Sequence, residues 1–282
     1  MSNEAIAALP PLRDVIREGG LQATKALGQN FLLDLNLTAS IAKLNGSLDG
    51  LDAVEIGPGP GGLTRALLLS GARGVHAIEY DTRAIEALQP LVSAAGGRLT
   101  LHHADALEFD ALACGEEGLR VVIANLPYNV ATPILINLLR GIHARGDKAT
   151  RFMLLMFQKE VAERIVATPD SKAYGRLAVM AQWLCDVKVA KVLPPSAFTP
   201  PPKVHSAVVR FLPKVRTDGV TFDVMEKLVA EAFGQRRKML RSTLKAYVHL
   251  LAQAGIDETA RAEDVPASAF VKLAQLVSGA AT

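Results

Sequence analysis

The sequence predicts an α/β protein with a Rossmann-like sheet, followed by a small all-α domain. Three observations support this: short apolar runs alternate with helical patterns, a glycine-rich turn follows the first strand-like run of this series, and the pattern is purely helical from Phe222 onward. Strands that alternate with helices form parallel sheets, so their carboxyl ends share one edge, where ligands bind. We therefore expect a catalytic domain over residues 1–213 and a helical C-terminal domain over residues 214–282.

The individual elements follow from local patterns. A short helix over 12–18 starts after Pro10 and Pro11, and Asp34 can cap a helix whose apolar face includes Ile41. The expected strands are 53–56, 75–78, 99–102, 119–124 and 152–157, with helices near 62–70, 82–94 and 132–143 between them. Later come helices over 158–167 and 177–185, a β-rich run over 187–193 and a strand over 204–212.

Composition sets broad limits on function. The chain has 282 residues, 50% hydrophobic and 21% charged, as in an ordinary globular protein with ample core. A net charge of +3 only weakly favours an anionic partner. The 2 cysteines lack C-x-x-C spacing and the 6 histidines lack metal-ligand spacing, so we expect no disulfide and no metal site. The absence of a long apolar run or a signal-peptide pattern predicts a soluble, cytoplasmic protein without membrane contact.

The glycine-rich turn indicates an adenosine-containing cofactor. Gly57, Gly59 and Gly62 match the G-x-G-x-x-G spacing of dinucleotide-binding enzymes. A strand, a glycine turn and a helix let backbone N–H groups approach such a ligand closely. A very similar loop in methyltransferases holds S-adenosylmethionine, so the turn alone leaves NAD and S-adenosylmethionine as alternatives.

Two acids follow the next strands. Glu79 closes the second run and could accept hydrogen bonds from both ribose hydroxyls of an adenosine; the alternative is a surface carboxylate in a turn. Asp105 follows the third run and could accept a hydrogen bond from the adenine amine, while the Ala106 N–H donates to a ring nitrogen. The alternative for Asp105 is an N-cap on a following helix.

The fourth run ends in Asn-Leu-Pro-Tyr, residues 125–128, and this stretch favours one reaction. The exocyclic amine of adenine is a poor nucleophile because its lone pair is delocalised into the ring. The side-chain oxygen of Asn125 and the carbonyl of Leu126 could bind the amine hydrogens and favour a tetrahedral nitrogen. Tyr128 offers a stacking face for an extruded base. The alternative is an ordinary β–α turn in which Asn caps and Pro-Tyr packs.

These motifs together resemble the ribosomal RNA adenine dimethyltransferases, and most closely their bacterial small-subunit members. The matching segments are Gln-Asn-Phe-Leu at 29–32, Val-Glu-Ile-Gly-Pro-Gly at 54–59, Asn-Leu-Pro-Tyr at 125–128 and Phe-Thr-Pro-Pro-Pro-Lys-Val-His-Ser at 198–206. They occur in the family's order over roughly residues 24 to 245. The resemblance implies a Rossmann-like S-adenosylmethionine-dependent methyltransferase sheet.

The resemblance also implies residue roles. Phe198 would sandwich the target base opposite Tyr128, and Asn125 would lie between cofactor and target. The expected cofactor contacts are Asn30, Leu32, Gly57, Glu79, Asp105, Ala106 and Asn125.

A basic segment over residues 234–245 contains no acid. On a helix, Arg237, Arg241 and Lys245 would share one face, and Leu240 and Leu244 would face inward. A solvated surface is the simpler interpretation of such a charge run, and phosphate contact is the functional one. The residues expected to bind RNA are Lys203, Arg236, Arg237, Lys238 and Arg241.

The resemblance therefore implies dimethylation of two adjacent adenosines in a hairpin near the 3′ end of 16S rRNA. The partner would be the immature small ribosomal subunit, the cofactor S-adenosylmethionine without a metal, and the enzyme a monomer. A large-subunit dimethylase of the macrolide-resistance type and an RNA-binding protein that checks subunit assembly, with secondary catalysis, remain alternatives. A dehydrogenase does not explain residues 125–128.

Overall fold

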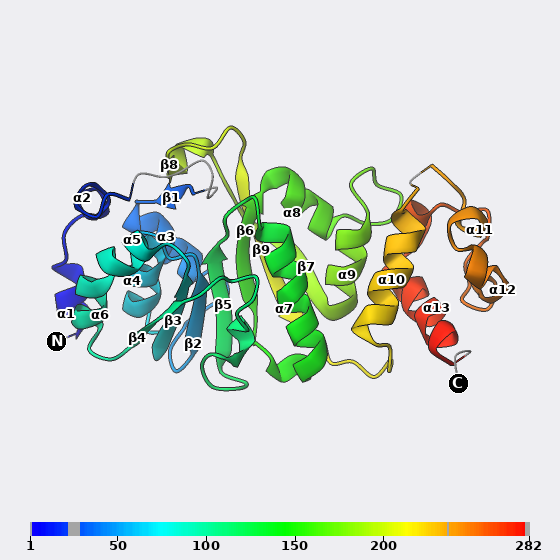
Figure 1. The fold of residues 1–282 in the computed structure, drawn as a ribbon, viewed down its shortest axis with the longest axis horizontal. Coiled ribbons are helices and arrows are strands. Elements are labelled where there is room, and N and C mark those ends of the chain that lie inside the picture. The colour runs from blue at the N-terminus through cyan, green and yellow to red at the C-terminus, as the bar shows by residue number, and fades with distance from the viewer. Residues whose placement is uncertain (1, 22–28, 236, 280–282) are drawn as a thin grey trace.

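A computed structural model describes residues 2–21, 29–235 and 237–279. The molecule is elongated, with α1 at one end and the helices α10 to α13 at the other (Figure 1). Its centre is a seven-stranded sheet of order β4-β3-β2-β5-β6-β9-β7. These strands are β2 (Asp52–Ile56), β3 (Gly74–Glu79), β4 (Leu99–His103), β5 (Arg120–Asn125), β6 (Met153–Gln158), β7 (Cys185–Leu193) and β9 (Ser206–Pro213).

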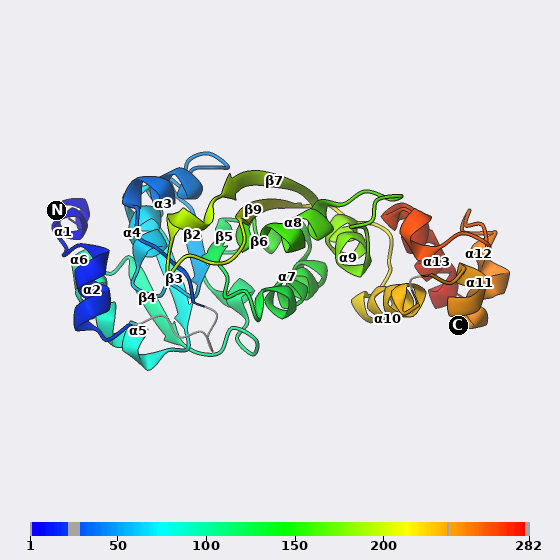
Figure 2. The same cartoon turned by 90° about the horizontal axis from the view of Figure 1, so that it is seen from above.

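The strands β4, β3, β2, β5 and β6 are parallel, as the sequence predicts, and β9 and β7 extend the sheet in antiparallel register. Helices cover both faces, so the central strands are buried on both sides and read as continuous apolar runs. Figure 2 shows α7 and α8 on one side of the sheet and α3 on the other. Within β2, Val54 belongs to the core under α7, and its neighbour Ala53 to the core under α4.

The helices mostly match the predicted segments. Their bounds are α1 (Ser2–Ala7), α2 (Leu12–Glu18), α3 (Leu35–Ala42), α4 (Gly62–Leu69), α5 (Thr82–Ala87), α6 (Gln89–Ala95), α7 (Ala131–Arg145), α8 (Lys159–Val166) and α9 (Arg176–Leu184). Asp34 caps α3, as predicted, by accepting the N–H groups of Asn36 and Leu37. The single helix predicted over 82–94 is wrong: Pro90 lies at the second position of α6, and a proline cannot continue a preceding helix.

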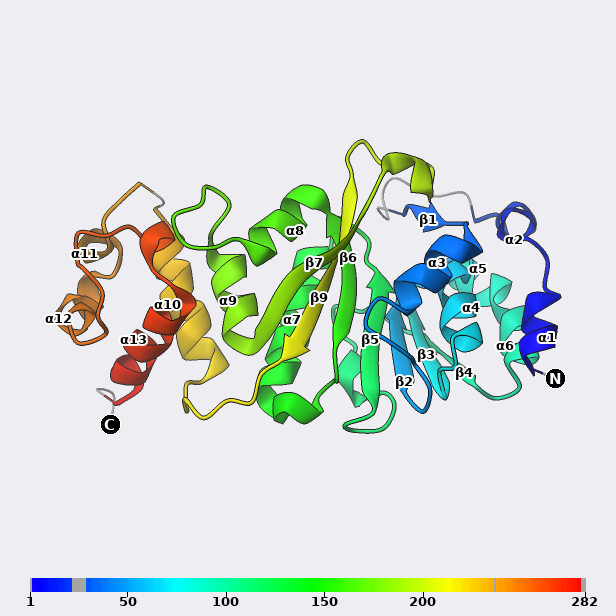
Figure 3. The same cartoon turned by 180° about the vertical axis from the view of Figure 1, so that it is seen from behind.

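Two short strands join segments that are far apart in the chain. Strand β1 (Phe31–Leu32) pairs antiparallel with β8 (Phe198–Thr199), and Leu32 lies opposite Phe198. Figure 3 shows this pair above the sheet, next to α3. The pairing places the N-terminal segment over the carboxyl edge of the parallel strands.

The C-terminal part contains α10 (Phe222–Phe233), α11 (Leu240–Thr243), α12 (Val248–Leu251) and α13 (Ala267–Gly279). Its buried side chains continue the core of the sheet through α9, and Phe233 packs against both Tyr174 and Phe270. The domain boundary at 213/214 stays a prediction. Among the described residues, no helix has both the length and the apolar character needed to cross a membrane.

The helix predicted for the basic segment is not formed, so the predicted shared face is wrong. Helix α10 ends at Phe233 and α11 begins only at Leu240, so Arg237 precedes the helix that contains Arg241. The reason is tertiary: the N–H of Leu240 donates to the carbonyl of Ala260, and that of Arg241 to the carbonyl of Glu258. Leu240 and Leu244 are buried, as predicted.

Candidate functional site

A cavity of about 250 Å³ opens at the carboxyl edge of the parallel strands. Residues that follow β2, β3, β4 and β5 line it, together with the segment before β1. It brings together most of the residues that the sequence assigned to cofactor and target: Asn30, Gly57, Glu79, Asp105, Ala106, Asn125, Leu126 and Tyr128.

The glycine turn forms one wall of this cavity. Gly57 has φ +70° and Gly59 φ +53°, a backbone region that favours glycine. The Gly57 N–H donates to the carbonyl of Ile78 at 2.9 Å. A Cβ atom on Gly59 would lie 2.8 Å from the ring of Phe31, so the turn packs directly against β1.

Glu79 is a buried carboxylate held by backbone donors. One oxygen accepts the N–H groups of Tyr80 and Asp81, both at 2.9 Å, and the other accepts that of Gly59 at 3.2 Å. Its side chain is not on the surface, because the residue is only 7% exposed. Burial raises the pKa of Glu79, and the N–H donors oppose that rise. A fixed acceptor of this kind suits the paired hydroxyls of a ribose.

Asp105 lies at the end of β4 and stabilises a turn. Its Oδ1 accepts the N–H of Leu107 at 2.8 Å, and its carbonyl accepts the N–H of Phe109. Residues 106–108 form turns, so Asp105 caps a turn and not the helix that the alternative interpretation required. Ala106 follows it along the cavity wall.

Asn125 connects β5 to the N-terminal segment. Its Nδ2 donates to the carbonyl of Asn30 at 2.8 Å, which orients the amide and leaves Oδ1 as its acceptor atom. Leu126 is buried, and Pro127 packs against Gly57, since a Cβ there would lie 3.7 Å from the proline ring. The amide of Asn125 is thus held in one orientation, and Leu126 follows it along the cavity wall.

Tyr128 is anchored by a residue from β9, two strands away from β5 in the sheet. Its hydroxyl shares a 2.5 Å hydrogen bond with Oγ of Ser206, at the start of β9. Burial raises the pKa of Tyr128, so the phenol is neutral at physiological pH. The anchored ring lines the cavity.

The structure does not bring two predicted residues to this cavity. Phe198 is 3% exposed and packs in the core with Leu32, its partner across β1 and β8. The role of Phe198 as a partner of Tyr128 across the target base stays a prediction. Leu32 lines a small hollow next to the cavity, which it shares with Gly57 and Asn125.

The predicted RNA-binding residues lie apart from the cavity. Lys203, Arg237 and Lys238 are exposed, and Arg236 lies outside the described residues. Arg241 is also exposed, and its guanidinium is 3.7 Å from Glu258. In Figures 1 and 3 the connection between α10 and α11 lies along the same edge of the molecule as β8. The basic residues between α10 and α11 thus lie beyond α8 and α9 from the cavity, whereas Lys203 lies in the connection between β8 and β9.

Sequence reasoning missed two residues in or next to the cavity. Asp81 lines the cavity and accepts hydrogen bonds from Arg83 and Gln29. Ser206 acts through Tyr128. The position of Asp81 directly after a strand was a usable signal, whereas the contact between Ser206 and Tyr128 depends on strand order and leaves no local pattern.

Comparison with known proteins gives consistent results. A sequence profile described as "Ribosomal RNA adenine dimethylase" matches residues 20–278. The chain is 53% identical over 283 residues to "Ribosomal RNA small subunit methyltransferase A" of Cereibacter sphaeroides, covering 98% of this chain and 99% of that protein. A protein of the same description from Bradyrhizobium diazoefficiens is 53% identical over 277 residues, 96% of each chain.

Solved structures agree on the fold. The crystal structure of a dimethyladenosine transferase from Plasmodium falciparum superposes with a TM-score of 0.67 at 25% identity, covering 85% of this chain and 93% of that chain. The 23S rRNA methyltransferase ErmE superposes with a TM-score of 0.63 at 24% identity, covering 86% of this chain and 98% of its own, which supports the fold alone.

Proposed function

Because this chain belongs to the ribosomal RNA adenine dimethylase family, we propose that it methylates the exocyclic amines of two adjacent adenosines in a hairpin near the 3′ end of 16S rRNA. The observation that carries the proposal is the placement of residues 125–128 at the cavity, with the Asn125 amide fixed by Asn30. The relatives at about half identity over nearly the whole chain are described as small-subunit enzymes, which favours this substrate over large-subunit rRNA.

The cavity fits S-adenosylmethionine. The glycine turn leaves room for close backbone approach, and Glu79 presents a fixed carboxylate for the ribose. Asp105 and Ala106 would bind the adenine edge, while Asn30, Leu32 and Gly57 would contact the methionine part. When bound, this cofactor supplies an electrophilic methyl group.

The chain's own residues would prepare the nucleophile. Oδ1 of Asn125 and the carbonyl of Leu126 accept the two amine hydrogens, which favours a tetrahedral nitrogen with a localised lone pair. Tyr128 stacks on the extruded base, and its bond to Ser206 keeps the ring in place. The product amine releases its proton to water, so this account assigns no side chain as a general base.

The partner in this proposal is 16S rRNA within the immature small subunit. The enzyme would bind it as a monomer. Such a hairpin is recognised mostly through its shape and backbone, with the target base displaced from the stack. The exposed basic residues Lys203, Arg237, Lys238 and Arg241 would contact phosphates.

The direct test of the amine site is Asn125→Ala, with Asn36→Ala on the exposed face of α3 as the matched control. We expect Asn125→Ala to lower the rate of methyl transfer to immature small subunits by at least about a hundredfold, as loss of a fixed polar group at a reacting centre does. Particle binding should persist. Calorimetry should detect S-adenosylmethionine binding and no NAD binding by the unsubstituted protein. An active Asn125→Ala enzyme, or NAD binding in place of S-adenosylmethionine, would contradict the proposal.

A further inference from the structure

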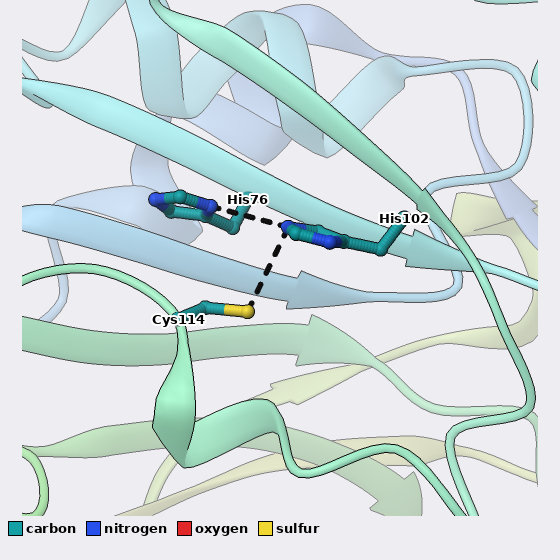
Figure 4. Close-up of side chains that lie close together, drawn as sticks. All are labelled: His76, His102 and Cys114. Atoms are coloured by element: carbon teal, nitrogen blue, oxygen red, sulfur yellow. Dashed lines mark hydrogen bonds between the residues drawn. The ribbon is translucent and has the colours of Figure 1, made fainter.

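Three side chains of metal-ligating type converge outside the cofactor cavity. His76 comes from β3, His102 from β4, and Cys114 from the loop that leads to β5 (Figure 4). Nδ1 of His76 lies 3.2 Å from Nε2 of His102, which in turn lies 3.7 Å from Sγ of Cys114. All three atoms lie within 4.8 Å of one another.

The separations of the His102 nitrogen from its two neighbours match those of ligands that share one tetrahedral zinc ion. Zn–N bonds of about 2.05 Å and Zn–S bonds of about 2.3 Å place two nitrogens about 3.3 Å apart and a nitrogen about 3.6 Å from a sulfur. The two imidazole rings are close to parallel, with 24° between their planes. The two nitrogens now face each other as a hydrogen-bonded pair, and both rings would have to rotate about their side-chain bonds to bind one ion.

The surroundings act on a bound cation in opposing ways. Burial lowers the pKa of both His76 and His102, which keeps the imidazoles neutral and able to donate a lone pair. The carboxylate of Asp52 acts electrostatically on His76 but is already paired with Arg73. The nearby guanidinium of Arg120 opposes a cation and donates to the carbonyl of Cys114. Burial and Asp110 raise the pKa of Cys114, so metal binding would release the thiol proton.

We propose that Nδ1 of His76, Nε2 of His102 and Sγ of Cys114 form a zinc site, with water as the fourth ligand. None of the three residues lines the cofactor cavity, so the site would be structural and not part of methyl transfer. It would link β3, β4 and the loop after Ala113 on the α7 side of the sheet. Sequence spacing could not reveal it, because the ligands come from three elements that only the fold brings together.

The experiment uses the full-length protein, freed of metal with a chelator and titrated with Zn²⁺ and with Co²⁺. We expect one equivalent of either ion to bind, a thiolate-to-cobalt charge-transfer band in the near ultraviolet, and a rise of Tm with Zn²⁺. Cys114→Ser should remove the band, and His76→Gln or His102→Gln should weaken Zn²⁺ binding by more than about a hundredfold, beyond the usual effect of losing an outer-sphere partner.

Two control variants keep the result specific. His103→Gln changes the exposed neighbour of His102, and Cys185→Ala removes the other cysteine, so both should bind Zn²⁺ as the unsubstituted protein does. Absence of stoichiometric binding, or a charge-transfer band that survives Cys114→Ser, would overturn the proposal. Circular dichroism of each variant separates loss of the site from loss of the fold.

Discussion

At the residue scale, the carboxyl edge of the sheet explains why the cofactor residues could be predicted. Glu79 and Asn125 each end a strand and Asp105 follows one, and parallel strands bring their carboxyl ends to one edge. Their convergence therefore follows from strand alternation alone. The environment of Phe198 could not be predicted in this way, because it depends on pairing with Leu32, far away in the chain.

Burial of Phe198 makes its two possible roles separable. Phe198→Ala should lower the free energy of unfolding by about 3–5 kcal/mol, since it empties a core position. Phe198→Leu retains most of the packing and removes the aromatic face. If the ring only packs, the Leu variant should methylate at nearly the normal rate in a kinetic assay. A large loss of kcat in a stably folded Leu variant would instead support base stacking after a local rearrangement.

Glu55 predicts a pH dependence of stability. It is 1% exposed, its Oε2 accepts the Thr64 hydroxyl at 2.6 Å, and burial raises its pKa to about 8. A carboxyl whose pKa is higher in the folded state contributes stability below its unfolded pKa near 4.5, and that contribution is lost as pH rises through about 8. We expect the protein to lose stability relative to Glu55→Gln between these pH values, by at most about 5 kcal/mol.

Urea denaturation of both proteins at pH 5 and pH 8 measures this difference. Glu86→Gln, at an exposed position on α5, is the matched control and should follow the unsubstituted protein. Equal pH dependence of the Glu55→Gln and unsubstituted proteins would show that Glu55 does not titrate in this range.

At the element scale, the close contact between the glycine turn and β1 sets the position of β1 and of Asn30, which precedes it. A Cβ on Gly62 would lie 2.4 Å from the carbonyl oxygen of Leu32, which is closer than packing permits. Gly62→Ala must therefore displace β1 and, with it, Asn30. We expect a loss of about 1–3 kcal/mol in stability and weaker S-adenosylmethionine binding, measured by calorimetry.

The control for this substitution is Gly175→Ala, where a Cβ would meet no atom within 4 Å and the backbone is extended. Both variants add one methyl group, so the comparison isolates the contact with Leu32. If the Gly62→Ala and Gly175→Ala proteins bind S-adenosylmethionine with equal affinity, the position of β1 does not control cofactor binding.

Also at the element scale, the helix predicted over the basic segment is wrong for a tertiary reason, whereas the break at Pro90 within 82–94 has a local one. The basic segment has helical periodicity, yet backbone bonds from Leu240 to Ala260 and from Arg241 to Glu258 interrupt it. Local patterns predict elements that local forces decide. They do not predict a turn that is imposed by backbone hydrogen bonds to residues farther along the chain.

At the scale of the whole molecule, the exposed basic residues predict a salt-dependent partner. Replacing Arg237 and Lys238 by Ala should weaken binding to immature small subunits and flatten the plot of log affinity against log salt by about one unit of slope per lost phosphate contact. Replacing Lys227 and Lys272, on α10 and α13, removes equal charge and should leave the slope unchanged. Equal slopes for both double variants would show that the basic segment is a solvated surface that does not contact phosphates.

The central claim is the identity of the methylated nucleotides. The most direct measurement incubates the purified protein and S-adenosylmethionine with small subunits from a strain that lacks this enzyme, then maps the modified nucleosides of 16S rRNA by mass spectrometry. The account predicts N6,N6-dimethyladenosine at two adjacent positions in a hairpin near the 3′ end. Modification confined to large-subunit rRNA, or to an atom other than the adenine amine, would contradict it.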